Sequence, residues 1–178
     1  PPGIWRTVFP TRVGETDDEC LSHEGIQGRL QKFFPKDGDY NIMYAGLYHV
    51  HQRVVEAFRK GRVLVAGDAA HVNNPIGGLG MNGGIHDAVS LGEHLSRVID
   101  GEDDALLDVY SRQRHKAQMD GVQATSIANK KLMEAKDPTI RQQQLDDVRA
   151  TAEDPAKSRA YCLNAGLFTS LEKAAAVT

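Results

Sequence analysis

The sequence has little cysteine: among its 178 residues only Cys20 and Cys162 carry a thiol. Two cysteines so far apart exclude the dense disulfide framework of a small secreted domain, and they do not have the spacing of metal ligands. We therefore expect two unpaired, reduced thiols and a cytoplasmic protein. The chain also lacks an initiator methionine, since it begins Pro1-Pro2-Gly3, and we infer that upstream sequence has been removed or was never included.

The sequence also lacks an excess of positive charge and any long apolar run. Lys and Arg number 21 against 24 Asp and Glu, which gives a formal net charge of −3. Binding to a phosphate backbone usually needs a basic stripe, and none is visible, so we expect no nucleic-acid partner. No apolar run approaches the roughly 20 residues of a membrane-spanning helix, and no signal peptide is visible. Hydrophobic residues still make up 40% of the chain, which is enough for a packed core.

The hydrophobic patterns predict a strand-containing start, one buried strand and a helical tail. Alternation and β-branched runs predict strands over residues 4–9, 40–50 and 62–66. Helical spacing and capping residues predict helices over residues 22–34, 82–101, 104–135, 139–152 and 156–173. The expected fold class is therefore an α+β or α/β fragment: the end of one sheet, a further strand with a Gly-rich loop, and then helices.

The most informative stretch joins the strand predicted over residues 62–66 to the helix that follows. Asp68 comes directly after this strand, where ligands bind in open α/β sheets, so its carboxylate could accept a hydrogen bond from a ligand hydroxyl. A loop rich in Gly, Pro and Asn fills residues 72–84, and glycines allow backbone N–H groups to approach a planar ligand. The helix N-terminus near Asn82 adds about half a positive charge. Together these features suit an anion that forms on a ring during a reaction.

The same stretch resembles a known fingerprint. It contains Gly67-Asp68-Ala69-Ala70-His71, Pro75, Gly77-Gly78-Leu79-Gly80-Met81-Asn82 and Asp87-Ala88. This pattern is similar to the second FAD fingerprint of the para-hydroxybenzoate hydroxylase-like flavoprotein monooxygenases. By this resemblance the chain is the C-terminal part of such a protein. Residues 1–60 would end the substrate-binding domain, 61–101 would be the C-terminal portion of the FAD-binding domain, and 102–178 a helical region.

The resemblance implies that this stretch holds one edge of FAD. Asp68 would hydrogen-bond the ribitol chain, and Pro75 would lie beside the flavin ring, near an aromatic substrate. The start of the following helix would face the pyrimidine edge of the ring and stabilise the anionic reduced flavin. No catalytic residue follows from the resemblance. The residues that it assigns to FAD are Asp68, Pro75, Gly77, Gly78, Gly80, Met81 and Asn82.

The resemblance also implies an activity. In this family NAD(P)H reduces the flavin, O2 adds to give a hydroperoxyflavin, and the terminal oxygen attacks a phenolic ring. We therefore expect part of a monooxygenase for a phenolic or other aromatic substrate. Asn73-Asn74 stands where many relatives have a second proline, which alters the expected loop shape. The family's N-terminal βαβ unit, whose Gly-rich turn holds the pyrophosphate, has no counterpart here. We expect this chain alone to bind FAD weakly or not at all, and to pair with that half or form a homo-oligomer.

Other interpretations stay open on the sequence alone. Flavin-dependent halogenases and reductases of the same superfamily share the Gly-Asp fingerprint, and a non-catalytic interaction module would also fit. Gly78–Gly83 matches G-x-G-x-x-G, but a dinucleotide turn needs these glycines directly after a strand. Asp68 could instead cap its own turn. His71 could join His49 and His51 at a metal site, although we favour a hydrogen-bonded loop histidine and expect no metal.

Overall fold

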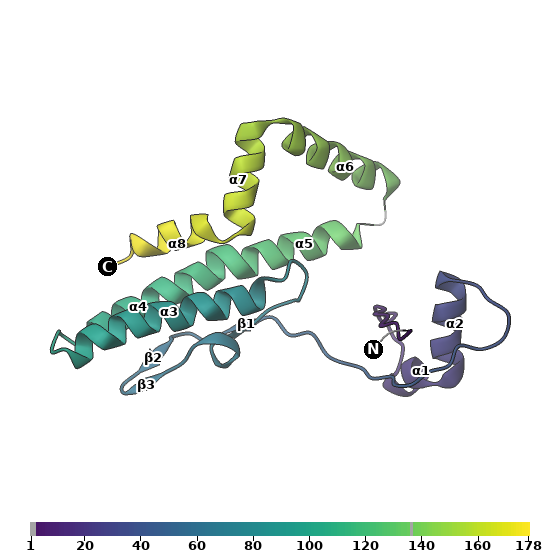
Figure 1. The fold of residues 1–178 in the computed structure, drawn as a ribbon, viewed down its shortest axis with the longest axis horizontal. Helices are drawn as coiled ribbons and strands as arrows, with labels where there is room; N and C mark the ends of the chain where they lie inside the picture. The colour runs from purple at the N-terminus through teal and green to yellow at the C-terminus, as the bar shows by residue number, and fades with distance from the viewer. Residues whose placement is uncertain (1–2, 136) are drawn as a thin grey trace. The chain divides into compact units, whose positions relative to one another are not determined.

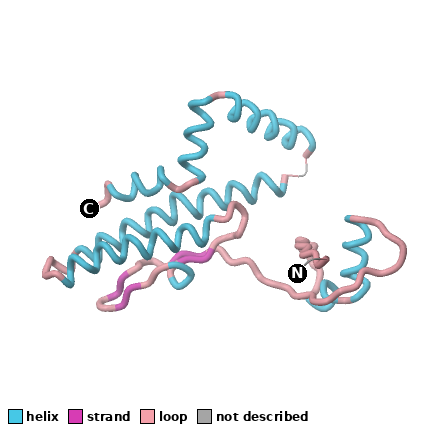
Figure 2. The backbone as a smooth tube through the Cα atoms, in the orientation of Figure 1, coloured by secondary structure: helices cyan, strands magenta, loops and turns pink. Residues whose placement is uncertain are grey.

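The computed structural model describes residues 3–135 and 137–178 of the chain. The chain divides into two compact units, of which one ends at His49 and the other covers Val50–Thr178. Helices dominate the described part, and its strands are only two residues long (Figure 2). The expected mixed fold class is therefore correct only in part, because the observed structure is mostly helical.

The first unit is built on two short helices, α1 (Asp17–Leu21) and α2 (His23–Phe33). Thr16 caps α1 through a capping box, in which its hydroxyl and a glutamate side chain satisfy each other's backbone amides. The Ser22 hydroxyl accepts a hydrogen bond from a backbone amide in the first turn of α2. The helix predicted over residues 22–34 is thereby confirmed, together with its capping residue.

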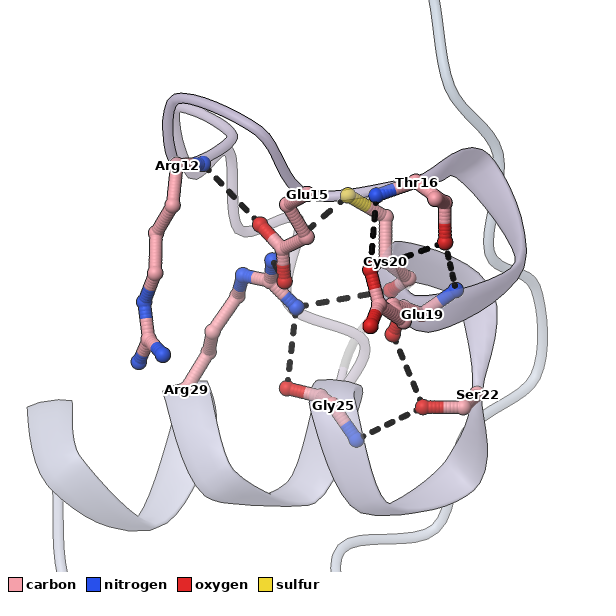
Figure 3. Close-up of polar contacts among 8 residues, drawn as sticks. All are labelled: Arg12, Glu15, Thr16, Glu19, Cys20, Ser22, Gly25 and Arg29. Carbon is pink, nitrogen blue, oxygen red and sulfur yellow. Dashed lines mark hydrogen bonds and ion pairs between the residues drawn. The ribbon is translucent and has the colours of Figure 1, made fainter.

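An ion pair joins Arg29 on α2 to Glu15, which lies just before α1 (Figure 3). The Arg29 guanidinium also donates to the Gly25 carbonyl at 3.0 Å and lies 3.7 Å from the Cys20 sulfur. Burial raises the pKa of the Cys20 thiol, and the neighbouring Glu15 raises it further. Because only the thiolate is nucleophilic, Cys20 is a structural residue of this unit.

Two small antiparallel ribbons lie at the start of the second unit. β1 (Arg53–Val54) pairs with β4 (His71–Val72), and β2 (Arg59–Lys60) pairs with β3 (Val63–Leu64). Gly61 takes part in the turn between β2 and β3 with a φ of +60°, a left-handed conformation that glycine adopts without strain. These ribbons bring the end of β3 and the start of the following turn against the helices.

Helices make up the rest of the second unit (Figure 1). They are α3 (Leu79–Ile99), α4 (Leu106–Ala117), the π-helical turn η2 (Gln118–Gln123), α5 (Ala124–Glu134), α6 (Pro138–Glu153), α7 (Pro155–Ala165) and α8 (Phe168–Ala175). After α3 the chain reverses at Gly101, whose φ is +103°, and α4 runs back along α3. α4, η2 and α5 continue as one helix, which confirms the long helix predicted over residues 104–135.

The hydrophobic core of the second unit lies between the ribbons and the helices. Phe58, Ala70 and Tyr110 are buried together, and half-buried residues such as Leu64 and Leu91 pack against them. A smaller cluster joins α3, η2 and the start of α8. Its members are Leu79, Val122 and Leu167. The first cluster fixes the end of β3 to α4, and this positions the turn that follows β3 and contains Asp68.

Some expected elements are wrong. Residues 4–9 and 40–50 are not strands, because an extended segment becomes a strand only when another pairs with it, and none does among the described residues. The strand expected over residues 62–66 is reduced to β3. The single helix expected over residues 156–173 is two helices, because Leu167 has a φ of +65° and ends the helical path between α7 and α8.

Candidate functional site

The turn after β3 presents a free carboxylate. The Val65 carbonyl accepts from the Tyr110 hydroxyl at 2.7 Å, which ties the end of the hairpin to α4. The short 3₁₀ turn η1 (Gly67–Ala69) follows, and Gly67 enters it with a φ of +59°. Asp68 is exposed in this turn, and no group in the described part of the chain hydrogen-bonds its carboxylate. The carboxylate is therefore available to a ligand and does not cap its own turn.

The loop between β4 and α3 is shaped by its asparagines and glycines. The Asn74 side-chain oxygen accepts from a backbone amide two residues later at 3.1 Å, and the Asn73 side chain donates to the Asn74 carbonyl at 2.8 Å. The Gly78 amide donates to the Pro75 carbonyl at 3.0 Å and closes a turn. Gly77 and Gly78 have φ values of +104° and +66°, which favour glycine. Pro75 and both glycines are exposed, so the loop is open on this side.

Helix α3 begins without a side-chain cap. Gly78 is its N-cap and has no side chain to accept a hydrogen bond, so the amides of Leu79, Gly80 and Met81 lack an intrahelical acceptor. Met81 is 75% exposed, and Asn82 is exposed as well. The helix starts three residues before the predicted position at Asn82, because glycines provide no capping signal in the sequence. Such an end attracts anions and carbonyl oxygens.

Two glycines let η1 and α3 approach each other closely. A Cβ on Gly84 would lie 3.3 Å from the Gly67 Cα, which is tighter than ordinary van der Waals contact. The contact places the turn that carries Asp68 against the first turns of α3. The structure thus brings the carboxylate, the glycine loop and the uncapped helix end into one region of the second unit.

The most highly connected buried charge in this region, Asp87 on α3, has no role in the sequence-based prediction. It is fully buried. Its Oδ2 accepts from the His71 Nε2 at 2.6 Å and from the Gly67 amide at 3.0 Å. Its Oδ1 accepts from the Arg114 Nε at 2.7 Å and lies 3.4 Å from the Gln118 Nε2. One carboxylate therefore connects η1, β4, α4 and η2.

A signal for this cluster was present in the sequence of α4. Leu107, Tyr110, Arg114 and Ala117 recur at spacings of three and four residues, and the structure buries all four. An arginine on a buried helical face needs a countercharge, because an unpaired charge is very costly in the protein interior. The spacing shows that a carboxylate must face Arg114, but it does not identify Asp87 as the partner.

The Asp87 carboxylate is held in its ionised form. Burial alone would raise its pKa, but the hydrogen bonds from His71 and Arg114 and the positive charge of Arg114 outweigh burial and hold the pKa below the usual 3.8. Burial raises the pKa of the Tyr110 phenol, and the negative charge of Asp87 raises it further. Tyr110 therefore stays protonated and can donate to the Val65 carbonyl.

We expect Asp87→Asn to weaken the acid sensitivity of the protein. The Asp87 pKa is lower in the folded than in the unfolded state, so the ionised group stabilises the fold above the unfolded pKa. This stabilisation is lost as the pH falls through the folded pKa, with an onset below about pH 5. Urea unfolding between about pH 7 and pH 3 should therefore show a steeper loss of stability in the wild type than in the variant. Parallel pH profiles would contradict this assignment.

The His71 ring is committed to Asp87. Its side chain is fully buried, and its Nε2 hydrogen-bonds the Asp87 carboxylate. The prediction of a hydrogen-bonded histidine is therefore confirmed, but His71 lies in β4 and not in a loop.

Residues 3–135 and 137–178 contain no cluster of three or more His, Cys, Asp or Glu side chains arranged to hold a metal ion. Within the same residues, no helix combines the length and apolar character needed to cross a membrane.

The chain matches a known protein family and is similar to several known proteins. Residues 3–125 match the model of the family described as FAD binding domain. The para-nitrophenol 4-monooxygenase of Pseudomonas sp. (strain WBC-3) is 36% identical over 170 residues, which cover 91% of this chain and 41% of that protein. The 6-hydroxy-3-succinoylpyridine 3-monooxygenase HspB of Pseudomonas putida (strain DSM 28022 / S16) is 41% identical over 118 residues, which cover 64% of this chain and 28% of that protein.

A solved structure is also similar. The crystal structure of p-nitrophenol 4-monooxygenase PnpA from Pseudomonas putida DLL-E4 matches with a TM-score of 0.74 and 33% sequence identity. The match covers 89% of this chain and 40% of that chain. The chain therefore spans less than half the length of the relatives that it matches.

Proposed function

This chain belongs to the FAD binding domain family, and from this premise we propose that it supplies the C-terminal part of an FAD-dependent monooxygenase that hydroxylates an aromatic substrate. Two relatives are named as monooxygenases of a nitrophenol and of a hydroxylated pyridine, which supports a substrate with a phenolic or related ring. Since the chain spans 41% or less of these relatives, the rest of the flavin site, including the turn for the pyrophosphate, would come from the remaining sequence.

The observation that carries this proposal is a carboxylate with no hydrogen-bond partner among the described residues, on a turn that packs against α3, whose first backbone amides lack an intrahelical acceptor. The exposed Asp68 carboxylate is an acceptor, and the uncapped start of α3 offers donors. FAD fits this pair, because its ribitol carries hydroxyl donors and one edge of its ring carries carbonyl acceptors. The exposed Gly78 leaves space for a planar ring, since a Cβ on it would meet no atom within 4 Å.

We propose that Asp68 and the start of α3 contact FAD and that Pro75 lies beside the substrate. Asp68 would accept hydrogen bonds from the ribitol, and the backbone of residues 80–82 would face the pyrimidine edge. The positive end of α3 would stabilise negative charge on the reduced ring. Pro75, in the exposed loop with Gly77 and Gly78, would border the aromatic substrate. FAD, reduced by NAD(P)H, would supply the chemistry that activates O2.

The test is FAD binding by the full-length protein, in which this chain is joined to the rest of the flavin-binding sequence. We expect Asp68→Asn to raise the Kd for FAD about tenfold or more, because a hydrogen bond to a charged acceptor contributes about 1.5–3 kcal/mol. Quenching of flavin fluorescence measures the Kd. The matched control is Asp100→Asn, which changes an exposed aspartate at the opposite end of α3 and should leave the Kd unchanged.

Three outcomes would count against the proposal. Failure of the full-length wild type to bind FAD would reject the function. An unchanged Kd in Asp68→Asn would reject the role of this carboxylate. A tight yellow complex formed with FAD by residues 1–178 alone would contradict the expectation that part of the flavin site lies elsewhere.

A further inference from the structure

Asp87 is a buried carboxylate to which the proposed function gives no role. It is fully buried, and it pairs at 2.7 Å with Arg114, whose side chain is only 4% exposed. Desolvation makes such pairs costly, so they rarely add net stability relative to apolar residues of the same volume. Among the described residues, His71 Nδ1 and Gln118 Oε1 next to this pair are buried with no hydrogen-bond partner. Because unsatisfied buried groups are also unfavourable, the arrangement points to a requirement beyond stability.

The pair fixes the turn that carries Asp68. The Asp87 Oδ2 accepts at 3.0 Å from the amide of Gly67, the residue directly before Asp68. His71 donates to the same oxygen at 2.6 Å from β4, and Arg114 holds the other oxygen from α4. The carboxylate is therefore held on both sides and cannot move away from the turn without breaking buried charged hydrogen bonds.

We propose that Asp87 is a positioning residue of the flavin site, one that holds the Asp68 turn at a fixed place relative to the start of α3. Asp87 belongs to α3 itself, eight residues beyond Leu79, or about 12 Å along the helix axis. A movement of the turn relative to Asp87 is thus a movement of Asp68 relative to the free amides. This inference rests on the proposed function, in which both groups hold FAD. Their separation is set before FAD binds, and such preorganisation raises affinity.

A double-mutant cycle in the flavin-binding full-length protein tests the proposal. Asp87→Asn keeps the shape of the side chain and removes its charge. We expect it to raise the Kd for FAD about tenfold, as Asp68→Asn does, and we expect the double variant to exceed the higher single value by less than about threefold. The reason is that holding the turn in place has little value once the Asp68 carboxylate is gone. An effect that works through overall stability would instead be additive, with a roughly hundredfold higher Kd.

The matched control is Ser111→Ala on α4. The Ser111 hydroxyl accepts from the buried Phe58 amide at 2.9 Å, so this variant also deprives a backbone amide of its side-chain acceptor. It should lower stability and leave the Kd for FAD within about twofold of the wild type. Additive changes in the cycle, or an equal loss of affinity in Ser111→Ala, would overturn the role of Asp87. A wild type that does not bind FAD would instead reject the proposed function.

A measurement on the wild type covers the case in which Asp87→Asn does not fold. Before flavin is added to the full-length protein, the Gly67 amide should exchange its hydrogen about 100-fold more slowly than the amide of Asp68. Gly67 donates to a buried carboxylate, whereas the Asp68 amide has no acceptor in the described part of the chain. Equal exchange rates across the turn would overturn the proposal, because it requires the bond between Gly67 and Asp87 to persist in solution.

Discussion

Replacing Arg114 with methionine is expected to lower the free energy of unfolding by about 3–5 kcal/mol. Methionine has a similar length and fits a buried position, so the loss comes from charge and not from volume. The substitution leaves the Asp87 carboxylate, which is 0% exposed, without its countercharge. Urea unfolding followed by circular dichroism at neutral pH, where the carboxylate is ionised, measures the difference.

Arg112→Met is the matched control for this prediction. It makes the same change two residues earlier on α4, where the exposed Arg112 side chain donates to the Thr178 carbonyl at 3.2 Å. Surface substitutions of this kind change stability by less than about 0.5 kcal/mol. Equal losses in the two variants would show that the buried pair with Asp87 does not determine the result.

The second large effect is expected in the aromatic core, where Phe58→Ala should lower the free energy of unfolding by about 3–5 kcal/mol. Phe58 is fully buried. Its ring is edge-on to Tyr110 at a centroid distance of 6.2 Å and stacks on His71 at 6.2 Å. Alanine would leave a cavity between the hairpin and α4, and it would remove one face of the packing around His71. A thermal melt and a urea titration measure the loss.

Phe168→Ala on α8 controls for the loss of a phenylalanine as such. Phe168 is 56% exposed, so truncation removes much less buried area and should cost less than about 1.5 kcal/mol. Phe58→Leu should lie between the two alanine variants, because it retains most of the buried apolar volume. A stability loss in Phe168→Ala as large as that in Phe58→Ala would argue against this location of the core.

The helices were largely predictable from local signals, and the strands were not. Ser22 indicates the start of α2, because its hydroxyl accepts a hydrogen bond from a backbone amide in the first turn of that helix. Residues 4–9 have a strand-like alternation, but a strand also needs a partner that local sequence cannot supply. Leu167 was not predicted either, since leucine gives no signal for a left-handed conformation. Its φ is +65°, and its side chain is buried in the cluster with Leu79 and Val122.

The candidate site was likewise predictable only where its features depend on residues that are consecutive in the sequence. The glycine loop and the position of Asp68 after β3 could be read from consecutive residues, because each feature depends on a short stretch of backbone. The network around Asp87 could not, since its partner Arg114 lies 27 residues further along the chain. A buried arginine indicates that a countercharge exists, whereas only the packing of α3 on α4 decides which carboxylate it meets.

The wide turn η2 has a consequence for the rim of the glycine loop. A π turn contains one residue more than the α turn it replaces, and one residue corresponds to about 100° of rotation around the helix axis. The side chains of α5 therefore point in directions rotated around the helix axis, compared with those they would have if α4 continued as a regular α-helix. One of them, Asn129, reaches the loop so closely that a Cβ on Gly77 would lie 2.8 Å from its Nδ2. The extra residue in η2 thus determines which α5 side chain borders the glycine loop.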